Sequence, residues 1–124
     1  MTQPLTLCLY ERVLPGSQLV NRMQDLGYRV QAISDPALLV EHAEREKPLL
    51  VIAELEPGQT DVCEAIARLK KHDPTAHIPV IAIASAQNTP LHEAARAAGA
   101  KLVVTDHAIL VHLDQFLEQA LQVD

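Results

Sequence analysis

The sequence predicts an α/β fold in which a doubly wound, five-stranded parallel sheet carries helices on both faces. Two observations lead to this prediction. Short apolar runs alternate with amphipathic helical segments along the 124 residues, so that each strand is followed by a helix after a short connection. The chain also has no internal repeat, low-complexity tract or linker, which predicts a single domain over residues 1–124.

Five apolar segments predict the strands. LTLCLY opens the series, YRVQAI alternates apolar and polar residues, and LLVIA is the most continuous apolar run, as expected of a parallel strand covered on both faces. IPVIAIA is another buried run, and KLVVT is a short one. In chain order the predicted strands are residues 5–10, 28–33, 49–53, 78–84 and 101–105.

Five amphipathic segments predict the helices that follow these strands. Gly27 stops the first and Gly99 stops the alanine-rich fourth, because glycine readily takes the left-handed conformation that ends a helix. Ser34 or Asp35 caps the second helix, and Asp61 opens the third. In chain order the predicted helices are residues 17–27, 36–46, 61–71, 89–100 and 109–121.

Composition argues against several classes of protein. No apolar run approaches the roughly 20 residues of a membrane-spanning helix, and the N-terminal MTQPLTLCLYER lacks the features of a signal peptide. We therefore expect a cytoplasmic protein with no membrane partner. Cys8 and Cys63 are the only cysteines and form no CxxC pair, which favours free thiols. A net charge of −6 and only three aromatic residues argue against nucleic acid as a direct partner.

Doubly wound folds bind their ligands beyond the carboxyl ends of the strands. Neither GxGxxG nor GxxxxGK[ST] follows the first predicted strand, where the sequence reads ERVLPGSQ, so we expect no nucleotide and no other cofactor. The candidate site residues at the strand ends are Tyr10, Glu11, Glu54, Ala84, Ser85 and Asp106.

Several segments, taken in order, resemble the receiver domain of two-component response regulators over essentially the whole chain. They are LCLYER, LGYRV, KPLLVIAELEPG, ARLKKHDPTAHIPVIAIASA and AARAAGAKLVVTD. The stretch HDPTAHIPVIAIAS followed by AAGA is the most specific of them. The resemblance implies the flavodoxin-like, receiver-type (βα)5 fold and a role in signal transduction.

The resemblance also implies which residues would carry phosphoryl chemistry. In receivers, acidic residues after the first strand hold magnesium, an aspartate ending the third strand accepts the phosphoryl group, and a Thr or Ser and a Lys contact its oxygens. Glu54 stands at the acceptor position, Ala84 at the hydroxyl position and Asp106 at the lysine position. Tyr10 and Glu11 stand where the acidic pair belongs, and the loop after Glu54 is one residue shorter than usual.

These departures predict a degenerate receiver, or pseudo-receiver, that is not phosphorylated by the ordinary route and is not an enzyme. Glutamate is one methylene longer than aspartate, and a misplacement of about 1 Å can cost roughly a hundredfold in rate. Asp106 reverses the charge that a lysine would supply, and Ala84 has no hydroxyl. Ser85 is adjacent, but it replaces that hydroxyl only if the strand end is re-registered.

Glu54 has two interpretations within this prediction. Its extra methylene would let the carboxylate imitate phospho-aspartate and hold the domain in an active-like state. Alternatively, Glu54 is a solvated strand end without signalling meaning, which we favour because the Thr and Lys that would respond to the charge are absent. Glu11, Glu54 and Asp106 together could attract a divalent cation or raise a carboxylate pKa, but we predict no metal site.

Other chemically active residues have structural interpretations. Cys8 lies inside the first strand and is expected to be buried. Cys63 lies in the first turn of a helix, where the dipole would lower the thiol pKa, although an incidental role is favoured. Arg68, Lys70 and Lys71 form a basic helix end, either a solvated face or a docking site for an acidic partner. No HxxxH or HxH spacing occurs among the histidines.

In receivers the fourth helix, fifth strand and fifth helix form the surface that contacts partners. A Tyr or Phe on the fifth strand reports the state of the site, and here that position is Val103. We expect a protein partner at this surface, either a regulatory or output domain or a second copy that forms a homodimer. The expected partner-face residues are His92, Glu93, Arg96, Lys101, Val103, Val111, His112 and Gln115.

Two other functions remain as alternatives. A residual phosphoacceptor would use Glu56, Asp61 or Ser85 in an unconventional way. A small-ligand sensor would use the pocket reshaped near Tyr10.

Overall fold

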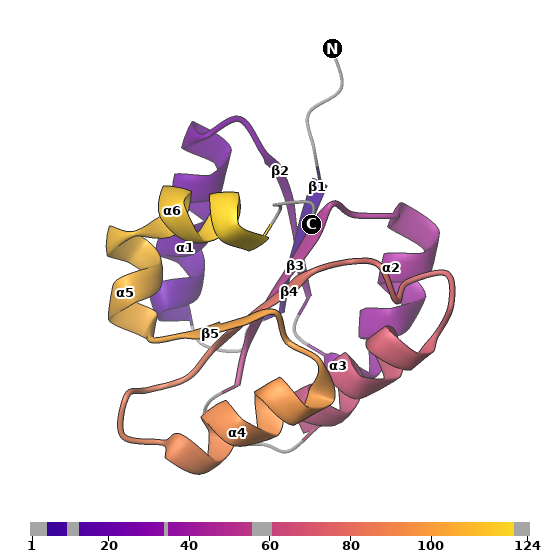
Figure 1. Cartoon of the computed structure of the whole chain (residues 1–124). Coiled ribbons are helices and arrows are strands. Elements are labelled where there is room, and N and C mark those ends of the chain that lie inside the picture. Colours follow the sequence, from indigo (N-terminus) through magenta and orange to yellow (C-terminus); the bar gives the residue numbers. More distant parts are fainter. Residues whose placement is uncertain (1–4, 10–12, 34, 56–60, 121–124) are drawn as a thin grey trace.

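Five parallel strands form one sheet in the computed structural model (Figure 1). The structure describes residues 5–9, 13–33, 35–55 and 61–120, with the backbone alone at 13–17, 36, 61 and 106. The strands are β1 (Leu5–Leu9), β2 (Arg29–Ile33), β3 (Leu50–Glu54), β4 (Val80–Ile83) and β5 (Leu102–Val104). Their spatial order is β2-β1-β3-β4-β5, which places the reversal of strand order at β1 and β3.

The helices form a layer on each face of the sheet (Figure 1). One layer contains α2 (Leu39–Glu46), α3 (Asp61–Lys71) and α4 (Thr89–Ala98), with a 3-10 turn, η1 (Pro36–Leu38), before α2. The other contains α1 (Val13–Asp25), α5 (Asp106–Val111) and α6 (Leu113–Ala120). The predicted doubly wound α/β fold is therefore confirmed.

Two apolar cores lie between the sheet and these layers, because successive residues of a strand point to opposite faces. In β3, Val51 and Ala53 belong to the core under α2, α3 and α4, while Leu50 and Ile52 belong to the core under α1, α5 and α6. We call these the α3-side core and the α1-side core. All five residues of β3 are buried, as predicted for a strand covered on both faces.

The first helix starts earlier than the sequence predicts. The prediction began at residue 17, where helical spacing of apolar residues starts, whereas α1 begins at Val13 and includes Pro15 and Gly16. Proline is tolerated in the first turn of a helix, where its missing N–H would have no intrahelical partner. Asp35 caps the next helical segment as predicted, accepting a hydrogen bond from the Ala37 N–H at Oδ1 over 3.0 Å.

The predicted last helix is two helices in the structure. Thr105 was assigned to the fifth strand, but its Oγ1 accepts a hydrogen bond from the Ala108 N–H over 3.1 Å and caps α5. The helix then ends at Val111, and α6 begins at Leu113. The Leu110 carbonyl accepts a bond from Arg22 Nη2 at 3.3 Å, which ties the end of α5 to α1 at the point of the break.

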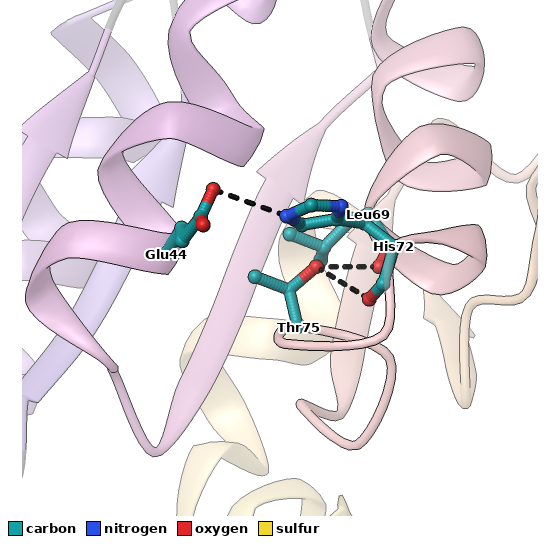
Figure 2. Close-up of polar contacts among 4 residues, drawn as sticks. All are labelled: Glu44, Leu69, His72 and Thr75. Atoms are coloured by element: carbon teal, nitrogen blue, oxygen red, sulfur yellow. Dashed lines mark hydrogen bonds and ion pairs between the residues drawn. The ribbon is translucent and has the colours of Figure 1, made fainter.

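Specific polar contacts fix the end of α3 (Figure 2). Thr75 is fully buried, and its Oγ1 donates to the Leu69 carbonyl at 2.7 Å and lies 3.2 Å from that of His72. The Leu69 carbonyl lies in the last turn of α3, where helix carbonyls lack intrahelical partners, so the hydroxyl satisfies it. The His72 carbonyl also accepts from the Thr75 N–H at 2.9 Å. His72 Nε2 lies 3.0 Å from Glu44 Oε2 and links α3 to α2.

Membrane insertion has no support among the described helices, since none is long and apolar enough to cross a bilayer.

Candidate functional site

Glu54 ends β3 at the carboxyl edge of the sheet, and its side chain is buried. Alternation along β3 puts Glu54 on the sheet face of Leu50 and Ile52. It is level with Ile83 of β4, which is in turn level with Val104 of β5. The residue is 4 % exposed. The interpretation of Glu54 as a solvated strand end is therefore wrong, because its side chain is buried.

Ala84 directly follows β4 and is part of the α3-side core. It is 2 % exposed, and its N–H donates to the Val104 carbonyl over 3.0 Å. The side chain contributes only a methyl group to apolar packing. A hydrogen-bond donor for a phosphoryl oxygen is thus absent at the position where the receiver resemblance requires one.

Ser85 is half-buried and begins the connection to α4. Its carbonyl accepts two hydrogen bonds, one from His92 Nε2 at 2.9 Å and one from the Asn88 N–H at 3.1 Å. Asn88 also caps α4 through Oδ1, which accepts from the Leu91 N–H at 3.4 Å. Sequence reasoning missed this bonding of the β4–α4 connection, although Asn88 before a proline-containing first turn is a capping signal.

The remaining predicted site residues lie wholly or partly outside the described residues. Tyr10 and Glu11, predicted after the first strand, are outside them, as is Glu56. Asp106 opens α5, so its backbone reaches the same edge as Glu54, while its side chain and that of Asp61 are outside the described part. Within the described part, no three His, Cys, Asp or Glu side chains form a metal-binding group.

Both cysteines are free thiols. Cys8 is buried in β1 as predicted, and burial raises its pKa to about 12. Burial also raises the pKa of the Cys63 thiol. The expected lowering by the dipole of α3 is therefore wrong, because desolvation of the thiolate outweighs the effect of the helix end.

The predicted partner-face residues surround the β5 edge of the sheet. β5 is an edge strand, with α4 in the layer on one face and α5 in the layer on the other (Figure 1). Val111 is 52 % exposed, as expected for the outer side of α5, whereas Val103 is half-buried against the α3-side core. His112 is exposed, and its ring contacts Phe116 edge to face with centroids 6.2 Å apart. His92 is also half-buried, because its ring bonds to Ser85.

Solved structures of receiver domains are similar to this chain over nearly its full length. A putative response regulator from Chloroflexus aurantiacus gives a TM-score of 0.87 at 17 % identity, covering 97 % of this chain and 98 % of that one. The receiver domain of a sensor histidine kinase from Pseudomonas aeruginosa, with magnesium coordinated in its active-site cleft, gives 0.85 at 18 % identity with the same coverage. A Vibrio cholerae chemotaxis protein gives 0.83 at 13 %, covering 96 % and 99 %.

These likenesses establish the fold. No family model and no curated protein sequence matches the chain. The flavodoxin-like, receiver-type architecture expected from the sequence is confirmed by the strand order and by the structural neighbours.

Proposed function

We propose that this domain is a signalling module with a receiver fold that acts by binding a protein partner and does not depend on phosphorylation. Its general support is the fold, which it shares with receiver domains along nearly the whole chain. Its specific support comes from the residues at the carboxyl edge, where receivers carry out phosphoryl transfer. On this proposal, the domain is not an enzyme.

The observation that carries the proposal is the packing of Ala84. Its methyl group belongs to the α3-side core, so the position offers apolar packing in place of a hydroxyl. Phosphoryl transfer depends on donors that are already in place around the developing charge. Without that donor, the edge has lost one of the groups that would stabilise the transferring phosphoryl oxygens.

The charge at this edge also opposes phosphorylation. Glu54 provides a buried carboxylate, and Asp106 at the start of α5 adds a second acidic residue where receivers have a lysine. An approaching phosphoryl donor is anionic, and acidic groups at this edge repel it. The burial of Glu54 further restricts access of a donor to the carboxylate oxygen.

The surface that we propose for partner binding is the partner face around β5. Exposed polar residues of α4 and the exposed Val111 of α5 give it a mixed composition. Mixed surfaces of this kind are typical of non-obligate interfaces, in which a few apolar contacts are surrounded by polar groups.

A two-dimensional amide NMR titration tests this proposal. Magnesium is added first and beryllofluoride second, because beryllofluoride stands in for the phosphoryl group in working receivers. We expect no saturable shift at Glu54, Leu55 or Ser85, and no added mass after incubation with acetyl phosphate. Saturable shifts that spread to α4 and β5, or a phosphorylated mass, would contradict the proposal.

The burial of Glu54 favours a second candidate function, in which its carboxylate imitates a phosphorylated aspartate. Glu54→Gln tests it, because glutamine keeps the shape and removes the charge. If the charge holds an active-like state, the amide signals of α4 and β5 shift along with those of β3. Shifts confined to β3 and its neighbours β1 and β4 would exclude the mimic and leave the main proposal intact.

A further inference from the structure

Five cations gather at the amino edge of the sheet, where α3 and α4 end and β5 begins. Lys70 lies against Gly99, so closely that a Cβ on Gly99 would be 2.7 Å from Lys70 Cγ. Lys70 Nζ donates to the Ile78 carbonyl at 2.8 Å, and Lys101 follows Gly99 by two residues. We call this surface the basic edge; its residues are Arg68, Lys70, Lys71, Arg96 and Lys101.

The basic edge stands out against the charge of the rest of the chain. Residues 61–101 contain five of the ten lysines and arginines but four of the sixteen acidic residues. This segment therefore has a net charge of +1, whereas the remainder of the chain has a net charge of −7. A surface of opposite sign to the rest of a molecule is able to steer a partner of the complementary charge to one place.

Two cations of the basic edge, Lys70 and Lys101, repel each other. Burial lowers the pKa of the Lys70 ammonium, and the positive charge of Lys101 lowers it further. Among the described residues, no ion pair joins Arg68, Lys71 or Arg96 to a carboxylate. An external anion would relieve this repulsion.

Helix dipoles explain only part of the arrangement. The carboxyl end of a helix favours a cation in its last turn, which accounts for the cations of α3 and for Arg96 of α4. Lys101 lies beyond the end of α4, at the start of β5, and its charge acts on Lys70. The dipoles therefore do not account for Lys101 beside Lys70.

The chemistry of the edge selects among anions. The carboxyl ends of α3 and α4 carry partial negative charge, which opposes a compact dianion such as phosphate; phosphate sites usually use helix amino ends instead. Three of the five cations are lysines, which are point charges and lack the forked geometry of arginine that matches phosphate. Nucleic acid would meet the net −7 of the rest of the chain. Carboxylates on a protein segment are single charges spaced apart, so each meets a smaller penalty than a phosphate dianion and is able to pair with one lysine at a time.

We propose that the basic edge docks a carboxylate-rich segment of a partner protein. The surface borders the partner face and shares Arg96 and Lys101 with it, so one partner is able to contact both. The proposal goes beyond the proposed function, because docking at the amino edge would hold whether or not the carboxyl edge is phosphorylated.

Fluorescence anisotropy tests the proposal with a labelled peptide of alternating glutamate and alanine. A peptide with glutamine in place of glutamate is the control for charge. We expect Lys71→Glu to weaken binding by about fivefold to tenfold, because reversal removes one attraction and adds one repulsion. Arg29→Glu changes the net charge equally and should leave affinity within about twofold, because Arg29 is on β2, the outermost strand on the side of the sheet away from β5. Circular dichroism melts verify folding of both variants, and Lys71→Gln provides a milder change.

Four outcomes would overturn the proposal. The wild-type domain fails to bind the glutamate peptide at low salt, or it binds the glutamine peptide equally well. Arg29→Glu weakens binding as much as Lys71→Glu, which would reduce the effect to net charge. Inorganic pyrophosphate or an oligonucleotide displaces the labelled peptide more effectively than unlabelled glutamate peptide does at the same total concentration of negative charge, which would make the edge a phosphate site. Sedimentation equilibrium shows self-association that Lys71→Glu abolishes, which would make a second copy the occupant.

Discussion

Thr75 and Ala84 lie near opposite ends of β4. They represent a difference between the two edges of the sheet in the hydrogen bonds that side chains make there. At the amino edge, the buried Thr75 hydroxyl bonds to two carbonyls at the end of α3, and Lys70 bonds to the Ile78 carbonyl. At the carboxyl edge, Ala84 adds only a methyl group, and Glu54 is buried beside Ile83. The polar side chains with defined partners at the amino edge stabilise the fold.

This difference bears on the chemistry that proteins of this fold usually perform at the carboxyl edge of the sheet. Doubly wound proteins bind ligands at the carboxyl edge, so a receiver concentrates its reactive groups there. In this domain the carboxyl edge has apolar packing at one of those positions, while the amino edge carries the like-charged surface. Four changes test the contrast between the two edges, beginning with the largest expected effect.

Gly99→Ala should be the most destabilising, by about 2–5 kcal/mol. Gly99 has φ of +115°, which costs roughly 1–2 kcal/mol for a residue with a Cβ, and the new Cβ would displace Lys70 at a further cost of about 1–3 kcal/mol. Gly27 is the matched control, because its φ is +93° but no atom lies within 4 Å of a Cβ there. Equal losses for both variants in urea unfolding would show that packing on Lys70 contributes nothing.

Thr75→Val should cost about 1–3 kcal/mol, because valine keeps the shape and leaves the Leu69 carbonyl at the end of α3 without its donor. Thr6 is equally buried, but its Oγ1 has no hydrogen-bond partner among the described residues. Thr6→Val should therefore be neutral or stabilise the fold by up to about 1 kcal/mol. Thermal unfolding of the two variants should show shifts of different sign or size, and equal destabilisation would contradict this account.

Ala84→Ser should cost about 1–2 kcal/mol, because it places a hydroxyl in the α3-side core. The variant should still show no response to beryllofluoride, since Glu54 and Asp106 remain. Urea unfolding and the amide titration measure the two effects. A stable variant that gains the response would show that one hydroxyl was the missing group, and that the carboxyl edge had retained the rest of its chemistry.

Lys70→Met should have the smallest effect, visible as a change in pH dependence. The folded-state pKa of Lys70 lies below its unfolded value of 10.5, so the unfolded chain binds more protons in the window just below that value. Stability from this group therefore rises as pH increases through the window and is lower at neutral pH. Lys70→Met should flatten the rise in free energy of unfolding, and an unchanged slope would contradict the lowering of the Lys70 pKa by burial and by Lys101.

Patterning of apolar residues predicted the strands well because both faces of this sheet are covered. The run Leu50 to Ala53 is continuously apolar because its residues are buried on both faces of the sheet. Local signals predicted less at helix ends. Helix α1 begins before the predicted start and contains Pro15, a residue that is common in turns. No glycine or proline marks the break at His112. The break coincides with a hydrogen bond from Arg22 of α1, a helix far from it in the sequence.

The sequence predicted which candidate residues stand at the ends of strands, but it did not predict how deeply their side chains are buried. Chain order placed Glu54 and Ala84 at strand ends, because strand ends follow from the apolar runs. The burial of Glu54 depends on tertiary packing, which periodicity within one segment does not report. The pKa of Cys63 shows the same limit, since its helix position suggested a lowering and its tertiary surroundings raise it.

β5 has three residues, and it forms one border of the sheet. Its outward main-chain groups are too few to template an additional strand from another polypeptide, and Lys101 stands directly before it. The domain is thereby protected at this border against β-augmentation and edge-to-edge aggregation. A partner that binds at this border, as we propose, must then contact side chains, so we expect its binding to be sequence-selective and to respond to ionic strength.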